Sequence, residues 1–242
     1  MEPLTAFVGT KNRDRKKMKK LILEIVLFTV FVAPGFADEN QNRQDAIAFI
    51  KESETTLQNF NNDPELQWFR NHFRRARGIL IIPTQVKGGF VFGGSGGTGV
   101  LFRHDFENNR WSYPAFYSMG SVSVGFQAGV EVAEVVLLIM TERGMDAFLS
   151  SKMQLGSDAS IALGPVGIGT QAATTDVLQY SRAKGLFLGL TLEGSIVSTR
   201  NALNEAYYGR PVSPVEIYIK GAVNNSQADS IRYKLSTLEK KP

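Results

Sequence analysis

The first regular pattern of apolar and polar positions lies in residues 43–60. Apolar side chains recur there every three or four positions, which predicts an amphipathic helix. These side chains are Ala46, Ile50, Leu57 and Phe60, with Ile47 beside them.

A second helix is predicted over residues 64–77. Asp63 can cap its start and Pro64 suits its first position, because proline has no backbone N–H to leave unpaired. Its apolar stripe consists of Leu66, Phe69, Phe73 and Ala76, and arginines run alongside that stripe.

From Gly78 to about Gly194 the pattern changes to short runs rich in valine, isoleucine, phenylalanine and tyrosine, separated by glycine. Such runs predict β-strands, and residues 107–110 predict a turn between two of them. A short helix at 142–151 and a last helix at 227–238 complete the pattern. We therefore predict one α+β domain over residues 38–242. It has an antiparallel, glycine-rich sheet or barrel-like core, N-terminal helices, one short mid-chain helix and a C-terminal helix.

The segment GSGGTG at residues 94–99 matches the glycine pattern of dinucleotide-binding loops. That function requires a helix to open on the glycines, so that its N-terminus can hold the pyrophosphate. Residues 100–109 are instead β-branched and aromatic and then turn-forming. We therefore predict a glycine-rich turn that joins two strands, and no nucleotide cofactor.

The N-terminus has the layout of a secretory signal peptide. Four lysines surround Met18, residues 21–33 are mostly apolar, and small residues precede Asp38. Cleavage after Ala37 is predicted, with Met18 as an alternative start and a retained anchor as the alternative to cleavage. The apolar run of 13 residues is short of the roughly 20 that a spanning helix needs.

Charge and composition exclude several classes of protein. Residues 1–37 hold seven of the 27 basic residues and three of the 23 acidic ones, which leaves 20 of each in the remainder. A formally neutral domain lacks the basic character of a general nucleic-acid binder. The absence of cysteine excludes disulfides, thiolate metal ligands and a thiol nucleophile.

The order of several short motifs resembles the SYLF domain family over about residues 45–221. The motifs begin with ARGI at 76–79, GGFVFGG at 88–94 and WSYPA at 111–115. They continue with GFQAG at 125–129, ERGM at 142–145 and GPVG at 164–167. The last are YSRAKGLF at 180–187 and LEGS at 192–195, followed by Asn201 and Tyr208-Gly209.

This resemblance implies binding of phosphoinositides and other anionic lipids. In eukaryotic members it also implies actin binding, usually beside an SH3 or FYVE module. Neither module fits in this chain, which looks like the stand-alone bacterial branch, so actin is not an expected partner. We expect an exported protein, periplasmic or extracellular, that associates peripherally with a membrane surface.

The predicted lipid contact lies on the second helix. Arginine side chains bind phosphate in a forked geometry, and aromatic rings suit the acyl boundary beneath the headgroups. The candidate residues are Trp68, Phe69, Arg70, Arg74, Arg75 and Arg77, followed by Lys87, Arg182 and Lys184. The alternative is that Phe69 and Phe73 pack on the sheet and the arginines are merely solvated.

Catalytic and metal-binding patterns are weak in this sequence, and we predict neither an enzyme nor a metal site. His104-Asp105 precedes a turn, where a solvated pair is expected. Glu131 and Glu134 would lie on opposite faces of a strand. Glu193 is predicted to pair with Arg182 or Lys184, with a ligand role as the alternative. The second functional hypothesis is an envelope scaffold that self-associates through its glycine-rich sheet.

Overall fold

The computed structural model of the chain describes residues 39–89, 92–124, 129–164, 175–183, 186–187 and 192–240. The chain divides into two units, Met1–Asp38 and Glu39–Pro242. The predicted signal peptide and Lys184 lie outside the described residues. None of the helices within those ranges is long and apolar enough to cross a membrane.

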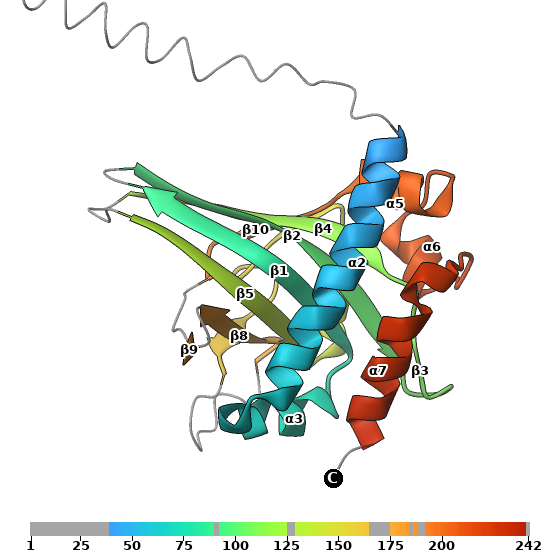
Figure 1. The fold of residues 1–242 in the computed structure, drawn as a ribbon, viewed down its shortest axis with the longest axis horizontal. Helices are drawn as coiled ribbons and strands as arrows, with labels where there is room; N and C mark the ends of the chain where they lie inside the picture. Colours follow the sequence, from blue (N-terminus) through green and yellow to red (C-terminus); the bar gives the residue numbers. More distant parts are fainter. Residues whose placement is uncertain are drawn as a thin grey trace, which may run out of the picture. The chain divides into compact units, whose positions relative to one another are not determined.

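The unit Glu39–Pro242 is built on one large sheet, as predicted for an α+β domain (Figure 1). Its main strand order is β6-β10-β4-β2-β1-β5-β8-β7, and every pairing is antiparallel except that of β7 with β8. The first strands are β1 (Gly78–Gly89), β2 (Phe92–Asp105), β3 (Arg110–Trp111), β4 (Ala115–Val124) and β5 (Gly129–Ile139). The remainder are β6 (Lys152–Gln154), β7 (Ile161–Leu163), β8 (Val177–Ala183), β9 (Leu186–Phe187) and β10 (Ile196–Thr199).

Several of the helices cover one face of this sheet. Figure 1 shows α2 crossing the central strands, with α7 beside it and α3 at its C-terminal end. The helices are α2 (Glu39–Asn62), α3 (Gln67–Phe73), α4 (Glu142–Ala147), α5 (Asn201–Tyr208), α6 (Pro214–Tyr218) and α7 (Asp229–Lys240). Short 3-10 turns, η1 (Pro64–Leu66) and η3 (Ser226–Ala228), precede α3 and α7.

The sheet separates two hydrophobic clusters because successive side chains of a strand point to opposite faces. Ile79 and Ile81 pack under the helices, together with Phe60 and Phe69. Leu80 and Ile82 face the other side, where they join the cluster that contains Phe148. β1 is therefore apolar at every position from 79 to 82, as expected for a strand that is buried on both faces.

The second predicted helix is shorter than its apolar spacing indicated. Pro64 begins a 3-10 turn, α3 ends at Phe73, and Arg74 forms its C-cap. Ala76 and Arg77 follow as non-helical residues, because the backbone N–H of Arg77 donates to the carbonyl of Ile139 on β5 at 2.7 Å. Pairing with the sheet thus ends the helix before its stripe is complete.

The glycine segment 94–99 lies inside β2, so the prediction of a strand-joining turn there was wrong. It pairs with β1 on one side and β4 on the other, and no helix follows it. A Cβ atom on Gly97 would lie 2.4 Å from Oε1 of Gln85, and one on Gly99 would lie 2.7 Å from Leu80. The glycines there allow neighbouring side chains to pack directly on the strand backbone.

Candidate functional site

The described surface contains a hollow of about 490 Å³ where the start of β1, the β2–β3 hairpin and the end of α6 meet. Five basic side chains line it: Arg77, Arg103, Arg110, Lys220 and Arg232. Three carboxylates line it as well: Asp105, Glu107 and Glu142. We call this hollow the arginine pocket, and its lining side chains carry a formal charge of +2.

A tight turn shapes one wall of the arginine pocket. Asn109 adopts a φ of 48°, which asparagine tolerates better than most residues. Asp105 accepts hydrogen bonds from the backbone N–H and the side chain of Asn108, at 3.1 and 2.7 Å. The side-chain bond from Asn108 is the largest of the contacts that lower the pKa of Asp105, and Arg110 adds to this effect. The turn therefore holds a charged carboxylate that fixes Arg110 at 3.3 Å.

Two arginines face one carboxylate on the opposite wall. Nη1 of Arg77 donates to Oε1 of Glu142 at 2.5 Å, and Nη2 of Arg103 lies 4.0 Å from Oε2. Arg103 also donates to the carbonyl of Tyr218 at 3.1 Å. The guanidinium of Arg77 lies 5.4 Å from the ring centroid of Phe106, within the range of a cation–π contact.

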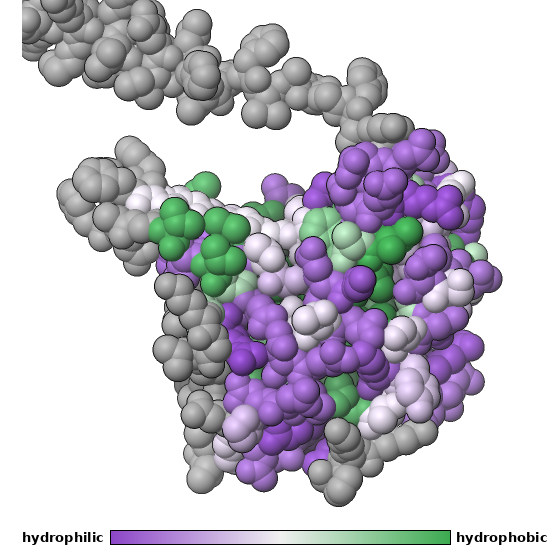
Figure 2. Space-filling view, in the orientation of Figure 1, coloured by the Kyte–Doolittle hydropathy of each residue, from purple (hydrophilic) through white to green (hydrophobic). Residues whose placement is uncertain are grey.

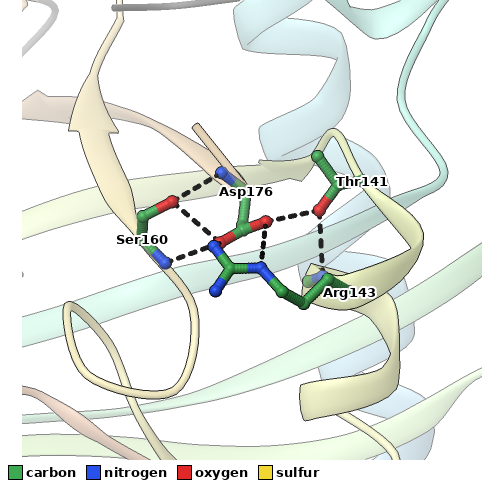
Figure 3. Close-up of polar contacts among 5 residues, drawn as sticks. Thr141, Arg143, Ser160 and Asp176 are labelled. Atoms are coloured by element: carbon green, nitrogen blue, oxygen red, sulfur yellow. Dashed lines mark hydrogen bonds and ion pairs between the residues drawn. The ribbon is translucent and has the colours of Figure 1, made fainter. Parts of the chain in front are cut away.

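Glu142 owes its position to the polar cluster drawn in Figure 3. Its two sequence neighbours, Thr141 and Arg143, both donate to the buried carboxylate of Asp176. Ser160 adds hydrogen bonds from its backbone N–H and its hydroxyl, at 2.9 and 2.8 Å. Burial alone would raise the pKa of Asp176, but the donors and the charge of Arg143 outweigh it and lower that pKa. This charged cluster anchors the start of α4, which carries Glu142.

Aromatic rings form the floor of the arginine pocket. Trp111 stacks on Phe73 at 5.3 Å between centroids and on His104 at 4.8 Å. His104 also contacts the ring of Phe106 edge-on at 4.2 Å. His104 is only 3% exposed, so the predicted solvated His104-Asp105 pair was wrong for the histidine. The reason is that β3 folds back and places Trp111 opposite His104.

Arg232 approaches the pocket from α7, far along the chain from the hairpin. Its guanidinium lies 3.9 Å from the ring centroid of Tyr113, and its Nε donates to the carbonyl of Trp111 at 3.0 Å. It also pairs with Asp229 one turn earlier, at 3.0 Å. Arg232 therefore joins α7 to the hairpin besides adding positive charge.

The residues predicted on the second helix divide into buried and exposed groups. Phe69 and Phe73 are 1% and 2% exposed, so these rings pack in the core beneath the sheet's helical layer. The alternative given for them from the sequence describes their placement correctly. Trp68 is 42% exposed.

The arginines of that segment also differ in their surroundings. Arg70 points inward and donates to the carbonyls of Asn61 and Asp63, at 3.1 and 2.8 Å. Arg74 and Arg75 are exposed at the end of α3, and Arg77 reaches the arginine pocket two residues later. The predicted cluster is thus continuous with the pocket through Arg77, whereas Arg70 serves the α2–α3 connection.

Of the remaining candidates, Arg182 lies 3.6 Å from Asp63 and 3.8 Å from Glu134, on the helical face of the sheet. Glu134 also accepts hydrogen bonds from α2. Lys87 is half-buried and opposite Glu131 in the β1–β5 register, which places Glu131 and Glu134 on opposite faces as predicted. Glu193 is exposed in a turn and Arg182 pairs with Asp63 and Glu134, so the predicted pairing of Glu193 with Arg182 was wrong. Its alternative partner, Lys184, lies outside the described residues.

Four cationic residues of the pocket were missed from the sequence: Arg103, Arg110, Lys220 and Arg232. Arg103 precedes a predicted hairpin turn and Arg110 is the last residue of that turn, so their proximity could have been inferred from it. Lys220 and Arg232 follow no local pattern that would place them beside that hairpin. Tertiary packing alone brings them there.

A second feature lies at the far ends of β1, β2, β4 and β5. Four valines are exposed there on one face of the sheet: Val86 (42%), Val122 (94%), Val130 (77%) and Val132 (52%). The strand register puts Val86 opposite Val132, and glycines opposite the other two. We call this surface the valine face. Figure 2 shows apolar side chains gathered at the left-hand end of the sheet.

Among the described residues, no group of three or more His, Cys, Asp or Glu side chains could hold a metal ion. We therefore take the arginine pocket as the candidate ligand site. Guanidinium groups bind anions such as carboxylate and phosphate through forked pairs of N–H donors.

Comparison with known proteins addresses the identity of the domain. Residues 120–238 match the Ysc84 family, described as Las17-binding protein actin regulator. Protein YSC84 of Saccharomyces cerevisiae is 33% identical over 144 residues, which are 56% of this chain and 30% of that protein. This chain is a member of the SYLF domain family. Human SH3 domain-containing YSC84-like protein 1 is 26% identical over 173 residues, 69% of this chain and 50% of that protein.

The SYLF chain thus spans between about a third and a half of these relatives' lengths. The family match includes Glu142, Asp176, Lys220 and Arg232. Arg77 and Arg103 lie before the matched segment. The arginine pocket of this SYLF domain therefore combines residues from inside and outside the family match.

Proposed function

We propose that this SYLF domain is an exported, non-enzymatic protein that binds anionic phospholipid headgroups at a membrane surface. The observation that carries the proposal is the convergence of five basic side chains on the arginine pocket, with Trp68, Arg74 and Arg75 exposed on the segment that leads to Arg77. We call the pocket and these three residues together the arginine end. Binding rather than catalysis is proposed because the basic side chains of the pocket outnumber its carboxylates, and guanidinium groups hold anions.

The energetics of such a contact are modest but sufficient. A basic residue near an anionic membrane contributes on the order of 1 kcal/mol. Tryptophan is suited to the interface between headgroups and acyl chains. Because Arg70 is bound to backbone carbonyls of its own chain, the proposed contact includes fewer cations than the sequence suggested.

The proposed partner is an anionic membrane surface, and no nucleic-acid partner is proposed. The match to an actin-regulator family and to longer relatives raises actin as a further candidate. We do not propose actin for this chain, because export to the periplasm or the extracellular side would separate it from a cytoskeleton.

Flotation with liposomes tests the arginine end. The variant Arg74→Gln/Arg75→Gln/Trp68→Ala should lose at least about tenfold in affinity for anionic vesicles, equivalent to about 1.4 kcal/mol. Binding of the unaltered protein should weaken with added salt, since surface charges are screened over about 8 to 10 Å. The control is Arg43→Gln/Lys51→Gln on α2, which removes the same charge from exposed positions elsewhere. Equal binding by both variants would contradict the proposal.

Export makes a separate prediction. Protein isolated from its native host should begin at Asp38, because small residues precede a predicted cleavage site after Ala37. N-terminal sequencing that finds residue 1 or residue 18 would overturn this part of the proposal and leave lipid binding open.

Self-association is the second candidate function, and the valine face favours it. Two copies could place valines of one sheet against glycine rows of the other, since glycines leave the backbone open to close approach. Burying one valine contributes up to about 1.5 kcal/mol. Four such residues support an association in the micromolar range or weaker.

Light scattering over a range of protein concentrations tests this second function. Val122→Asp/Val130→Asp should shift the protein to monomer, whereas Val215→Asp on α6, exposed by 38%, should not. Should the valine-face variant instead lose liposome binding while the unaltered protein is already monomeric, the valines contact lipid and self-association is excluded.

A further inference from the structure

Glu142 occupies the position in the arginine pocket that a bound anion would take. Its carboxylate faces both Arg77 and Arg103, and its side chain is 52% exposed. The arginines have other anchors: Arg103 is bound to the Tyr218 carbonyl, and Arg77 lies over the ring of Phe106. The two cations are therefore held in place independently of a carboxylate that can turn outward into solvent.

The charge and size of the pocket define the class of anion. The lining carries +2 with Glu142 included, and a phosphate monoester carries about −1.5 to −2 at pH 7. Two guanidinium groups can each offer a forked pair of donors to phosphate oxygens. A hollow of about 490 Å³ also leaves room for the alcohol portion of the ester, since small-ligand sites range from about 300 to 1,000 Å³.

We infer that the arginine pocket binds a phosphate monoester between Arg77 and Arg103, and that the phosphate displaces Glu142. This inference rests on the proposed function only where a membrane lipid supplies the phosphate monoester. The same chemistry is offered by a lipid headgroup and by a small soluble phosphate. Glu142 acts as an internal competitor that weakens binding of any anion with less charge.

Two probes distinguish the sources. Titration calorimetry with sn-glycerol 3-phosphate measures the soluble monoester without a membrane. Flotation with vesicles that contain phosphatidic acid, compared with vesicles that contain the diester phosphatidylglycerol, measures the lipid-borne monoester. Each probe is applied to the full chain, to Arg103→Gln and to Glu142→Gln. The control is Arg210→Gln, which removes an exposed, ion-paired arginine outside the pocket.

The two pocket variants should change affinity in opposite directions. Arg103→Gln should weaken binding about tenfold, the effect of losing a hydrogen bond to a charged group. Glu142→Gln should strengthen it about threefold or more, because the internal competitor loses its charge. Arg210→Gln should leave binding unchanged. Should Arg103→Gln fail to fold, Glu142→Gln decides alone, since tighter binding cannot come from a damaged structure.

The outcomes separate this inference from the proposed function. Opposite effects with both probes, or with phosphatidic acid alone, support a lipid headgroup in the pocket. Opposite effects with glycerol 3-phosphate alone support a soluble phosphate and leave membrane binding to the other residues of the arginine end. Failure of Glu142→Gln to tighten binding in both arms overturns the inference, even if anionic vesicles still bind the protein.

Discussion

At the scale of single residues, Asp176 links the stability of the domain to its site. The carboxylate is almost fully buried and accepts hydrogen bonds from Thr141, Arg143 and Ser160. Removing its charge would leave several buried donors poorly satisfied, which costs about 1 to 3 kcal/mol. Because Thr141 and Arg143 flank Glu142, the same change would also loosen one wall of the arginine pocket.

Asp176→Asn should therefore lower the free energy of unfolding by about 2 kcal/mol. For a domain of this size the melting temperature should fall by about 4 to 8 °C. Thermal unfolding followed by circular dichroism measures both. Asp158→Asn serves as control, because Asp158 is exposed and accepts a hydrogen bond from the backbone N–H of Gln154 at 2.7 Å. Equal melting temperatures for the two variants would contradict the role assigned to Asp176.

The lowered pKa of Asp176 also sets a pH dependence. Its folded-state pKa lies below the ordinary value of 3.8, so the unfolded chain binds the proton more readily. The stabilisation is therefore fully present above about pH 4 and is lost as the pH falls through the folded-state pKa. Unfolding midpoints measured from pH 6 down to pH 3 should fall more steeply for the unaltered protein than for Asp176→Asn. Parallel curves would exclude this contribution.

At the scale of elements, β2 explains the glycine-rich segment. The strand lies between β1 and β4, and its glycines alternate between a crowded face and an open one. Gly97 faces Gln85 and the carbonyl of Thr84, so a methyl group there would be forced against both. A methyl group on Gly96 would meet no atom within 4 Å beyond its own chain neighbours. Two adjacent glycines in one strand thus have different tolerances.

Gly97→Ala should destabilise the domain by about 1 to 3 kcal/mol, the range for overpacking. Gly96→Ala should be neutral or stabilise it by up to about 1 kcal/mol, because alanine restricts the unfolded chain. Chemical unfolding of both variants measures the difference. A similar change in the free energy of unfolding for the two variants would show that the atoms around Gly97 move to accept a methyl group without loss of stability.

The same strand makes a prediction about cofactors. Because β2 continues through GSGGTG and leads into a hairpin, no helix N-terminus is available there to hold a pyrophosphate. NAD, FAD and ATP should each leave the melting temperature unchanged. A saturable increase at micromolar ligand would show that this interpretation of the glycines is incomplete.

At the scale of the whole domain, the two candidate surfaces lie at opposite ends of β1. The strand begins at Gly78 beside Arg77 and reaches Val86 eight residues later. At about 3.3 Å per residue the two positions are about 26 Å apart. A flat membrane bound at the arginine end would therefore not touch the valine face. The two surfaces predict different orientations of the domain on the membrane.

Tryptophan fluorescence can distinguish the two orientations. The chain has two tryptophans, of which Trp68 is 42% exposed and Trp111 is 2% exposed. Anionic vesicles should shift the emission to shorter wavelength, because membrane contact removes water from around the indole ring of Trp68. The substitution Trp68→Phe should abolish this shift. Vesicle binding without any shift would point to the valine face as the membrane contact.

The sequence alone determined the class of the domain and its main elements. Helical spacing predicted α2 and α7 to within a few residues at each end, and runs rich in valine, isoleucine, phenylalanine and tyrosine predicted strands after Gly78. These features are local, because an apolar period of 3.6 residues in a helix or 2 residues in a strand indicates which side of that element is buried. The motif order also indicated the family, since it depends only on residue types and their positions.

Only the tertiary structure decided what covers each apolar stripe and which charges meet. The spacing of Phe69 and Phe73 suits a membrane and a core equally, and packing against Trp111 and Tyr180 settles their burial. Arg77, Arg103, Glu142 and Lys220 are separated by dozens of residues, so no local pattern could predict that they line one pocket. Sheet register and the docking of α6 and α7 bring them together, because long-range pairing, not sequence spacing, fixes distances between elements.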